Sequence, residues 1–254
     1  MGPRFSLKAR EHLGTAGEKR RFNALHFEEA ARRYDIATKA MSLGCDPFWK
    51  RRLVDSLPDL PSPVCVDLAC GTGDLSFLLA GRYPRGSVAG VDLVPAMLSL
   101  ARGRNRHPNV RFVRGDMCAL PFPDGCADIV TGGYALRNAP DLKVALAEIR
   151  RVLKDGAVAA FLDFCRPEAE LPRRIQYRVL RSWCGLWGRI LHGTFEVHGY
   201  VADSLERFPG RRRFREILEE EGFLLAGSHR FFPGTTELLV LRRAERRPPP
   251  AVGV

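Results

Sequence analysis

Short apolar runs alternate along the chain with longer segments in which apolar residues recur every three or four positions. The short runs have the length of buried strands, and the periodic segments have the spacing of amphipathic helices. Strands are predicted at residues 64–69, 87–93, 110–116, 126–133, 157–164, 224–232 and 236–242. Helices are predicted at residues 22–41, 46–57, 73–82, 94–104, 141–153, 167–190 and 210–222. Because strands and helices alternate, we expect an α/β fold with a doubly wound, mostly parallel sheet.

The last two predicted strands depart from this alternation. Leu224–Phe232 and Glu237–Leu241 are separated only by Pro233, Gly234 and a short turn, which leaves no room for a crossover helix. These two strands are therefore expected to form a hairpin. The complete prediction is a seven-stranded, mostly parallel sheet with an antiparallel last strand.

Length and composition indicate a single domain. The chain has 254 residues, of which 45% are apolar, and this is enough for one α/β core. We expect the domain to span residues 22–243, with a helical cap contributed by residues 22–57 and 167–207. Residues 1–21 are expected to be a flexible basic N-terminus, and residues 244–254 a disordered tail.

Three classes of protein are disfavoured by the remaining composition. The sequence has no apolar run of about 18 residues and no apolar signal core, so a cytoplasmic protein without a membrane span is expected. The seven cysteines form no C-x-x-C pair, which favours free thiols over a disulfide framework. The six histidines are scattered, and no metal site is predicted.

The segment from Val64 to Asp74, VCVDLACGTGD, combines a buried strand with a glycine turn at the start of a helix. Asp67 lies near the end of the strand, and Gly71, Thr72 and Gly73 open the helix. Glycines let a ligand approach the backbone, and a helix N-terminus offers unpaired N–H groups and a partial positive charge. This arrangement is typical of a nucleotide-binding unit.

The glycine spacing excludes two common phosphate-binding motifs. The sequence has no G-x-x-x-x-G-K-[ST] segment, and Ser76 stands where the third glycine of G-x-G-x-x-G would be. An acidic residue such as Asp67 ahead of G-x-G instead suits a ligand with an amino acid end. S-adenosylmethionine (SAM) is such a ligand, because its ammonium needs an anion and its carboxylate needs backbone donors. A seven-stranded sheet with a reversed last strand is also the Rossmann-like fold of SAM-dependent methyltransferases.

The next two predicted strands also end in acidic residues. Asp92 ends the second strand, where a carboxylate can accept hydrogen bonds from both hydroxyls of a ribose. Asp116 and Met117 end the third strand, where the carboxylate can accept from an adenine amino group while the Met side chain packs on the ring. Turn formation and helix capping are the alternative roles for each aspartate. Their recurrence at three strand ends favours a shared cofactor site, because ligands of such sheets bind beyond the carboxyl ends of the strands.

The segment after the fourth predicted strand, Thr131 to Asn138, bears on the acceptor of the methyl group. Enzymes that methylate base amino groups commonly carry a Pro-Pro-aromatic segment here, which this chain lacks, so we expect no nucleic-acid substrate. Arg137 could instead hold an oxyanion, and Asn138 could orient a hydroxyl. A structural ion pair is the alternative role for Arg137. The net charge of +11 would suit RNA or an anionic membrane surface, or would simply reflect an arginine-rich solvated face.

Four segments match a known pattern. They are Tyr34-Asp35 with Met41-Ser42 and Trp49; Ala119–Asp124 (ALPFPD) with Leu136-Arg137-Asn138; Arg151–Lys154 (RVLK); and Tyr200–Pro209 with Phe214 and Gly222-Phe223. In this order the chain resembles the UbiE/MenG-like C-methyltransferases of ubiquinone and menaquinone biosynthesis over roughly residues 30–225. The sequence departs from the family pattern at Asp46, where a His is usual, and at Gly133, where a Ser is often found at the cofactor site.

The resemblance implies SAM-dependent methylation of a ring carbon in a prenylated quinol. The acceptor would be demethylmenaquinol or a 2-methoxy-6-polyprenyl-benzoquinol. Arg137 would stabilise a phenolate, while Asn138 and Tyr34 would position the ring. Three groups could take the ring proton: a water held by Arg137, the carboxylate of Asp163, or the imidazole of His198. The sequence does not choose between them.

A second set of residues suits the isoprenoid tail of such an acceptor. Leu180, Trp183, Cys184, Trp187 and Leu191 recur at helical spacing within an arginine-containing segment. They could cover a tail pocket or contact a bilayer, giving a peripheral position on the inner face of the membrane, or they could simply pack on the core.

Alternative functions remain open at this level. These are methylation of another small aromatic or natural-product acceptor, methylation of RNA, and a non-catalytic scaffold in a quinone-synthesis complex. Whether the chain forms a homodimer is also left open by the sequence.

Overall fold

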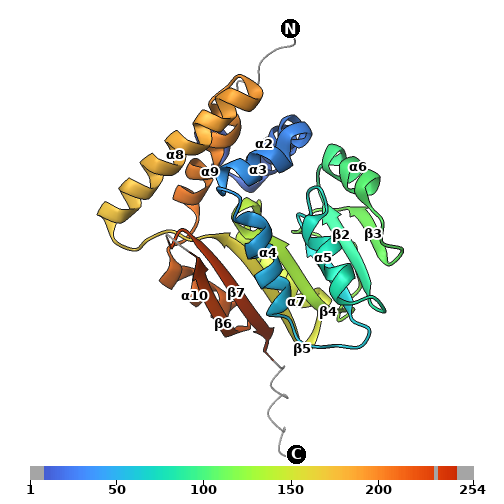
Figure 1. Ribbon diagram of the computed structural model, residues 1–254. Coiled ribbons are helices and arrows are strands. Elements are labelled where there is room, and N and C mark those ends of the chain that lie inside the picture. Colours follow the sequence, from blue (N-terminus) through green and yellow to red (C-terminus); the bar gives the residue numbers. More distant parts are fainter. Residues whose placement is uncertain (1–8, 232–233, 245–254) are drawn as a thin grey trace, which may run out of the picture.

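A computed structural model of the chain describes residues 9–231 and 234–244. Residues 1–8 of the predicted flexible N-terminus, and all but residue 244 of the tail predicted at 244–254, lie outside the described residues. The described part contains a seven-stranded sheet in the order β3-β2-β1-β4-β5-β7-β6 (Figure 1). The strands are β1 (Val64–Leu68), β2 (Ser87–Asp92), β3 (Val110–Arg114), β4 (Ala127–Gly133), β5 (Leu153–Phe164), β6 (Phe223–Phe231) and β7 (Thr236–Arg243). Strand β7 runs antiparallel to β5 and β6, and the pairs from β3 to β5 are parallel. The predicted fold and the final hairpin are confirmed.

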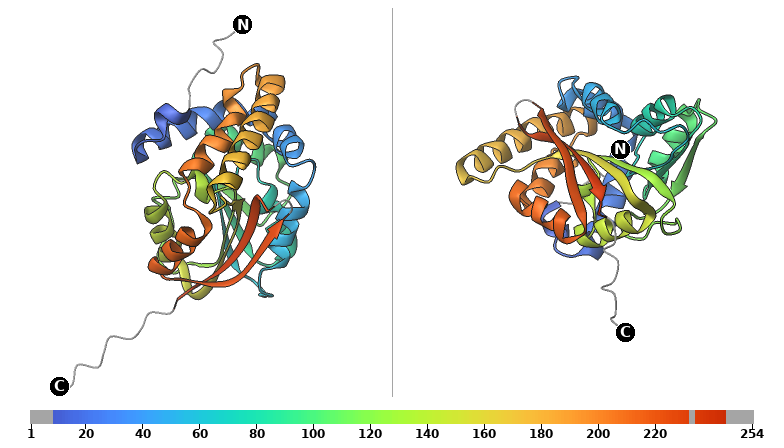
Figure 2. Two further views of the ribbon diagram at one scale, coloured as in Figure 1. Left: turned by 90° about the vertical axis from the view of Figure 1, so that its left-hand side faces the viewer. Right: turned by 90° about the horizontal axis from the view of Figure 1, so that it is seen from below.

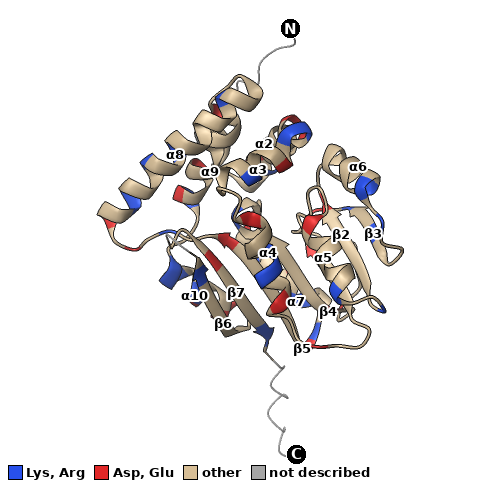
Figure 3. Cartoon of the chain, in the orientation of Figure 1, with Lys and Arg blue, Asp and Glu red and all other residues tan. Residues whose placement is uncertain are grey.

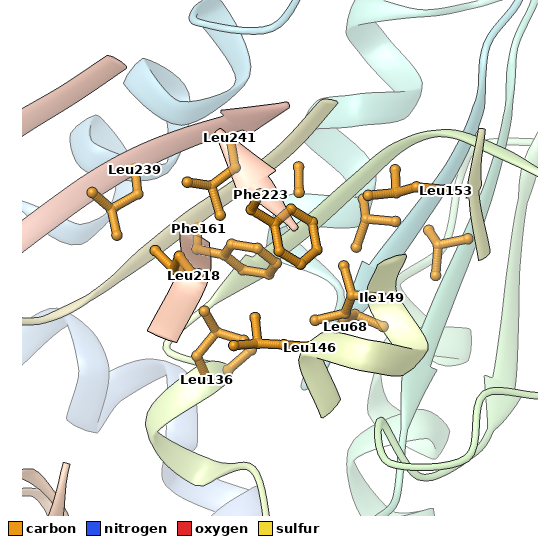
Figure 4. Packing of buried hydrophobic residues seen from close by; sticks show 14 of the residues in the cluster. Leu68, Leu136, Leu146, Ile149, Leu153, Phe161, Leu218, Phe223, Leu239 and Leu241 are labelled. Atoms are coloured by element: carbon orange, nitrogen blue, oxygen red, sulfur yellow. The ribbon is translucent and has the colours of Figure 1, made fainter. Parts of the chain in front are cut away.

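Helices cover both faces of this sheet. One face packs against α4 (Asp46–Asp55) and α5 (Asp74–Arg82), and the other against α7 (Leu142–Val152) and α10 (Arg211–Glu220). Helix α6 (Pro95–Arg104) lies beside β2 and β3. Figure 4 shows the second interface, where Leu146 and Ile149 of α7 meet Phe161 and Leu68 of the sheet. Fully burying a side chain of this size stabilises the fold by about 2 kcal/mol.

The remaining helices form a cap over one end of the sheet (Figures 1 and 2). They are α1 (Ala9–His12), α2 (Ala16–Ala30), the 3₁₀ turn η1 (Ala31–Arg33), α3 (Tyr34–Met41), α8 (Glu170–His192) and α9 (Glu196–Arg207). Hydrogen bonds join α2 and α3 to loops that follow the parallel strands, as between Asn23 and the carbonyl of Asn138 at 2.7 Å. The cap therefore covers the edge at which the sequence predicts a site.

The N-terminal part of the cap differs from the expectation in two ways. Residues 9–12 and 16–21 are helical rather than flexible, because Thr15 and Glu18 form a reciprocal capping box that starts α2. The single helix predicted at residues 22–41 is divided by the 3₁₀ turn at Ala31–Arg33.

Helix α9 has no counterpart among the predicted helices. Polar side chains, among them His198, Asp203 and Ser204, are buried in it together with apolar ones. Its sequence nevertheless has the contrast between an apolar and a polar face that is typical of a helix, so the pattern was present there and was overlooked.

Candidate active site

The loop between β1 and α5 has an unusual backbone. Ala69, Gly71 and Gly73 all have positive φ angles, of 47°, 54° and 93°. Left-handed conformations cost little for glycine, which explains the two glycines, while Ala69 is strained. The loop brings the amide of Gly71 to 2.8 Å from the carboxylate of Asp92, at the end of the neighbouring strand β2. The backbone of the glycine turn and the second acidic residue therefore lie side by side, as the sequence predicts.

Asp67 lies in the sheet interior and does not face the loop. Its side chain is fully buried and accepts hydrogen bonds from Ser76 at 2.6 Å and from Thr131 at 3.0 Å. Burial raises the pKa of this carboxyl to about 6. The expectation that Asp67 contacts the ammonium of SAM directly is therefore replaced by a supporting role, in which Asp67 joins β1 to α5 and β4.

Thr72 and Gly73 do not line the cavity at the predicted cofactor position. The hydroxyl of Thr72 donates to Asp35 of α3 at 2.6 Å, which attaches the glycine loop to the cap. A Cβ atom at Gly73 would lie 2.8 Å from the ring of Phe77, so this position requires glycine for packing as well as for its backbone angle. Only the Gly71 part of the motif faces the cavity that follows.

A first cavity, called here the cofactor cavity, lies beyond the carboxyl ends of β1, β2 and β3. It is lined by Asn23, Phe27, Tyr34, Ala69, Gly71, Val91, Asp92, Leu93, Val94, Met97, Gly115, Asp116, Met117, Gly133, Tyr134, Asn138 and Pro140. Five of the predicted cofactor residues are among them: Gly71, Asp92, Asp116, Met117 and Gly133. These five residues come from the ends of four different strands, and the fold brings them together around one cavity.

The side chains of this cavity suit a nucleoside, because they combine hydrogen-bond acceptors for a ribose with an apolar wall for a ring. Asp92 accepts from the amides of Gly71 at 2.8 Å and Val94 at 2.9 Å, and burial raises its pKa. A carboxylate has about four acceptor positions, so Asp92 retains capacity toward the ribose hydroxyls of SAM. Met97 and Met117 supply apolar wall for the adenine ring. The residues present therefore fit SAM.

Helix α2 closes over this cavity through charged residues that sequence reasoning missed. Arg20 forms an ion pair with Asp116, whose other oxygen accepts from the amide of Cys118 at 2.9 Å. The next residue, Lys19, donates to the carbonyl of Arg137 at 2.9 Å, and burial lowers its pKa to about 8. The N-terminal segment carried no motif that would have indicated these contacts.

A second cavity of about 800 Å³, called here the acceptor cavity, lies between the sheet and the cap. Its walls come from α2, α3, α8 and α9 and are mainly apolar, with Ala30, Met41, Trp49, Phe164, Leu180, Trp183 and Val197 among them. It shares Phe27, Tyr34, Tyr134 and Asn138 with the cofactor cavity. The two cavities are therefore neighbours that meet at these side chains.

Arg137 is the main charged group on the wall of the acceptor cavity. Its side chain is only 3% exposed, and its guanidinium lies 5.5 Å from the ring centre of Phe164 and 5.8 Å from that of Tyr200. It donates to the hydroxyl of Ser204 and pairs with Asp163 at 3.4 Å. A buried guanidinium held between two rings presents a fixed positive charge to whatever occupies the cavity. The ion-pair role considered for Arg137 and its position at the cavity both occur.

Asn138 is held by three neighbours. Its Nδ2 donates to the carbonyl of Tyr134 at 2.8 Å, and its Oδ1 lies 2.8 Å from the hydroxyl of Tyr200. That hydroxyl is also 2.9 Å from Asn23, so it can donate to either amide oxygen. The network fixes the wall between the two cavities.

Two tyrosines stand where the cavities meet. Tyr34 begins α3 close to Gly71, and burial raises its pKa to about 12, so its phenol is neutral. Tyr134 follows β4 with a φ of 58° and donates to Asp46 at 2.9 Å. Sequence reasoning assigned no role to Tyr134. The sequence did offer a signal for Tyr134, which comes directly after the two glycines at the end of β4 and shortly before the Leu-Arg-Asn segment.

The two candidate proton acceptors differ in position. Asp163 accepts from the amides of Arg137 at 3.0 Å and Phe164 at 2.8 Å and does not line the acceptor cavity. His198 does line it, and its Nε2 finds no hydrogen-bond partner among the described residues. Burial, followed by the charge of nearby His192, lowers the pKa of His198 to about 4. His198 is therefore a neutral imidazole on the lining of the cavity, with a buried Nε2.

All seven cysteines are free thiols. Within residues 9–231 and 234–244, no three His, Cys, Asp or Glu side chains gather as metal ligands would. No helix in that part of the chain is long and apolar enough to cross a bilayer.

Comparison with known proteins identifies the family to which these features correspond. Residues 15–238 match the model of the ubiE/COQ5 methyltransferase family. The demethylmenaquinone methyltransferase of Thermus thermophilus is 37% identical over 200 residues, which cover 78% of this chain and 90% of that protein. The 2-phytyl-1,4-naphtoquinone methyltransferase of a Nostoc species is 34% identical over 228 residues, covering 85% of this chain and 96% of that protein.

Solved structures share the fold at lower sequence identity. A methyltransferase of Haloferax volcanii, solved with the activator Trm112, superposes with a TM-score of 0.62 at 19% identity, covering 86% of this chain and 98% of that chain. The geranyl diphosphate C-methyltransferase of Streptomyces coelicolor, solved with S-adenosylhomocysteine, superposes with a TM-score of 0.60 at 16% identity. The match covers 78% of this chain and 79% of that chain. These structures support the Rossmann-like methyltransferase fold.

Proposed function

Because this chain belongs to the ubiE/COQ5 methyltransferase family and is a SAM-dependent methyltransferase, we propose that it methylates a ring carbon of a prenylated naphthoquinol. The observation that carries the proposal is the buried Arg137 guanidinium on the wall of a large apolar cavity, next to the cofactor cavity. The relatives described above are named for naphthoquinone substrates, which favours a naphthoquinol over a benzoquinol.

The cofactor cavity would hold SAM through side chains at the ends of β2 and β3 and through the backbone after β1. Asp92 would accept from the ribose hydroxyls, Asp116 would accept from the adenine amino group, and Met117 would pack on the ring. Gly71 would leave backbone free near the amino acid end. When bound, SAM supplies an electrophilic methyl group.

The acceptor cavity has the composition that a prenylated quinol needs. Its mainly apolar walls suit a flat ring and a hydrocarbon tail. Three of its polar residues, Tyr34, Tyr134 and Asn138, also line the cofactor cavity, and Arg137 is next to Asn138 in the chain. The ring would therefore lie at the shared wall, with the tail extending between α3 and α8.

Arg137 would activate the acceptor electrostatically. A phenolate is a much better carbon nucleophile than a phenol, so a fixed positive charge at the hydroxyl lowers the cost of forming it. Guanidinium stays protonated, which makes Arg137 a stabilising group rather than a base. Asn138 and Tyr34 would hold the ring in position, and the rigid hydrogen-bond network around Asn138 supports that role.

We assign the proton transfer to His198 rather than to Asp163. The quinol hydroxyl must lose its proton before transfer, and the methylated ring carbon loses one afterwards, to restore the aromatic ring. His198 lines the cavity as a neutral imidazole, and its buried Nε2, which has no hydrogen-bond partner among the described residues, would take the proton. Asp163 already accepts from two backbone amides and lies outside the cavity wall.

The test is methyl transfer from radiolabelled SAM to three acceptors offered in parallel. These are reduced demethylmenaquinol, a reduced 2-methoxy-6-polyprenyl-benzoquinol and total RNA. Label in a ring carbon of the naphthoquinol would support the proposal. Preference for the benzoquinol would instead assign the enzyme to ubiquinone biosynthesis. Label in RNA would contradict the proposal, as would SAM binding without any quinol product, which would favour a natural-product acceptor or a scaffold role.

We further propose that the enzyme works from the cytoplasmic side at a membrane surface. A long isoprenoid tail is soluble only in a bilayer, so the acceptor cavity must meet its substrate there. Flotation of the protein with lipid vesicles would test this placement.

A further inference from the structure

Helix α8 exposes an apolar stripe on the side facing away from the protein. Leu171, Ile175, Val179, Leu186 and Ile190 are between 47% and 70% exposed. At 3.6 residues per turn, these five positions fall within an arc of about 100°. The helix lies along the outer edge of the cap (Figure 1). One helix of 23 residues thus carries an apolar stripe in contact with solvent, with Ser182 as a polar residue inside it.

Arginines border this stripe on one side. By the same helical geometry, Arg174, Arg178 and Arg189 follow one edge of it, and Figure 3 shows Lys and Arg positions along α8. All three are exposed. Arg174 pairs with Glu170, whereas Arg178 and Arg189 form no ion pair with any described residue. Two positive charges are therefore available to an external anion.

The stripe is continuous with the mouth of the acceptor cavity. Leu171, Ile175 and Val179 are exposed and also line that cavity. Leu43, which follows α3 and is 77% exposed, lines it as well. The Nε1 of Trp183 donates to the carbonyl of Met41 at 3.0 Å, which fixes the end of α3 against α8. The opening of the cavity is therefore framed by exposed apolar side chains.

We infer that the outer face of α8, together with Leu43, docks on an anionic lipid bilayer and opens the acceptor cavity directly into it. The inference rests on the proposed function, since it is the isoprenoid tail that needs this entrance. The apolar stripe would enter the acyl boundary, and Arg178 and Arg189 would contact lipid phosphates. The quinol ring would then enter the cavity while its tail stays partly in the bilayer.

A second copy of the chain fits this surface less well. Docking of another protein would close the cavity mouth, whereas a bilayer leaves a hydrocarbon path for the tail. Charged residues are also depleted at the centre of stable protein interfaces, and here unpaired arginines border a narrow stripe. The basic charge of the chain, +11, matches an anionic lipid surface.

The test uses residues of the stripe that do not line the cavity. Leu186→Ser with Ile190→Ser removes apolar surface from α8 without touching the acceptor cavity. The matched control is Val144→Ser with Leu224→Ser, which makes the same kind of change at exposed sites on α7 and β6. A third variant, Arg178→Gln with Arg189→Gln, removes the two charges. Each protein is sedimented with vesicles of phosphatidylcholine, with or without phosphatidylglycerol.

We expect the control to bind the anionic vesicles like the unmodified protein. Leu186→Ser with Ile190→Ser should weaken binding by about tenfold or more, because less apolar surface is buried. Loss of the two arginines should weaken it by roughly fivefold per charge, and only for vesicles that contain phosphatidylglycerol. All variants should methylate a short-chain, water-soluble demethylmenaquinol at the same rate, while the two α8 variants, which bind vesicles weakly, should be slow on a long-chain quinol in vesicles.

Equal vesicle binding by the α8 variants and the control would overturn the inference. So would sedimentation velocity showing that these variants lose a dimer that the unmodified protein forms. Failure of the unmodified protein to methylate any quinol, short or long, would instead contradict the proposed function, and the vesicle measurement would still report on α8.

Discussion

The hydroxyl of Tyr134 donates a hydrogen bond to Asp46 over 2.9 Å and thereby fixes the wall shared by the two cavities to α4. The other oxygen of Asp46 pairs with Lys50 at 2.7 Å, and both side chains are buried. Asp46 is one of the positions at which the chain departs from the family pattern. Here the aspartate serves as the acceptor for a phenol and an ammonium at once.

Replacing Asp46 with Ala should strongly destabilise the protein. Lys50 would keep only Asp74 at 3.2 Å as a partner for its buried charge, and Tyr134 would lose its acceptor. Removing one member of a buried ion pair costs about 3–5 kcal/mol. Tyr134→Phe serves as the comparison, since it removes one hydrogen bond and should cost about 1 kcal/mol. Denaturant unfolding measures both, and equal losses would refute the central role of Asp46.

Replacing Arg137 with Lys should lower turnover by about 100-fold or more, the scale seen when a preorganised charge donor is removed. The lysine ammonium cannot reproduce the planar contacts with Ser204 and Asp163 or the stacking between Phe164 and Tyr200. The affinity for SAM, measured by calorimetry, should stay within about twofold, because Arg137 does not line the cofactor cavity. Unchanged turnover would remove Arg137 from the mechanism.

Replacing Asp92 with Ala should raise the dissociation constant for SAM by about 10- to 100-fold, through lost charge-assisted hydrogen bonds to the ribose. Asp59→Ala is the matched control, because it deletes the same charge at an exposed pair with Arg82 outside the cavity. Calorimetric affinity equal to that of the control variant would contradict the ribose assignment.

The pH dependence of stability should carry a contribution from His198. Its pKa is about 4 in the folded protein, against 6.5 normally, so between these values the unfolded chain binds a proton that the folded chain does not. Stability from this group is present above pH 6.5 and is lost as the pH falls toward 4, by about 1.4 kcal/mol per pH unit.

His198→Gln should therefore make the pH profile of unfolding shallower in that window. His26, with a pKa lowered to about 3 by burial, keeps a similar slope in both proteins. Asp67, with a pKa raised to about 6, acts in the opposite direction in both. The difference between the two profiles isolates His198, and parallel profiles would mean that its imidazole is not buried in a neutral form.

Gly133 should accept a serine, the residue often found there in the family. A Cβ atom at Gly133 would lie 3.9 Å from its nearest neighbours, Leu75 and Lys50. We expect Gly133→Ser to leave stability unchanged or to raise it by about 0.5 kcal/mol. Gly132→Ser is the contrasting variant, since its Cβ would lie 2.8 Å from that of Ala135. Thermal unfolding should separate the two, and a comparable loss in both would show that the wall at Gly133 is tighter than described.

The sequence predicts strand ends well but not the direction of the side chains there. Asp67, Asp92 and Asp116 all lie near strand ends as predicted, yet Asp67 faces the interior because Ser76 and Thr131 lie on that side. Such contacts depend on residues far apart in the chain. The pattern also misses the contacts of Lys19 and Arg20, because long cationic side chains leave no apolar periodicity.

Two neighbouring residues on α2 contact the walls of different cavities. Arg20 pairs with Asp116 of the cofactor cavity, and Lys19 donates to the carbonyl of Arg137 beside the acceptor cavity. A shift of this one helix therefore changes both walls. Any preference of SAM for one position of α2 becomes an energetic coupling to the quinol, and such coupling is reciprocal. By whatever factor SAM changes the affinity for the quinol, the quinol changes the affinity for SAM by the same factor.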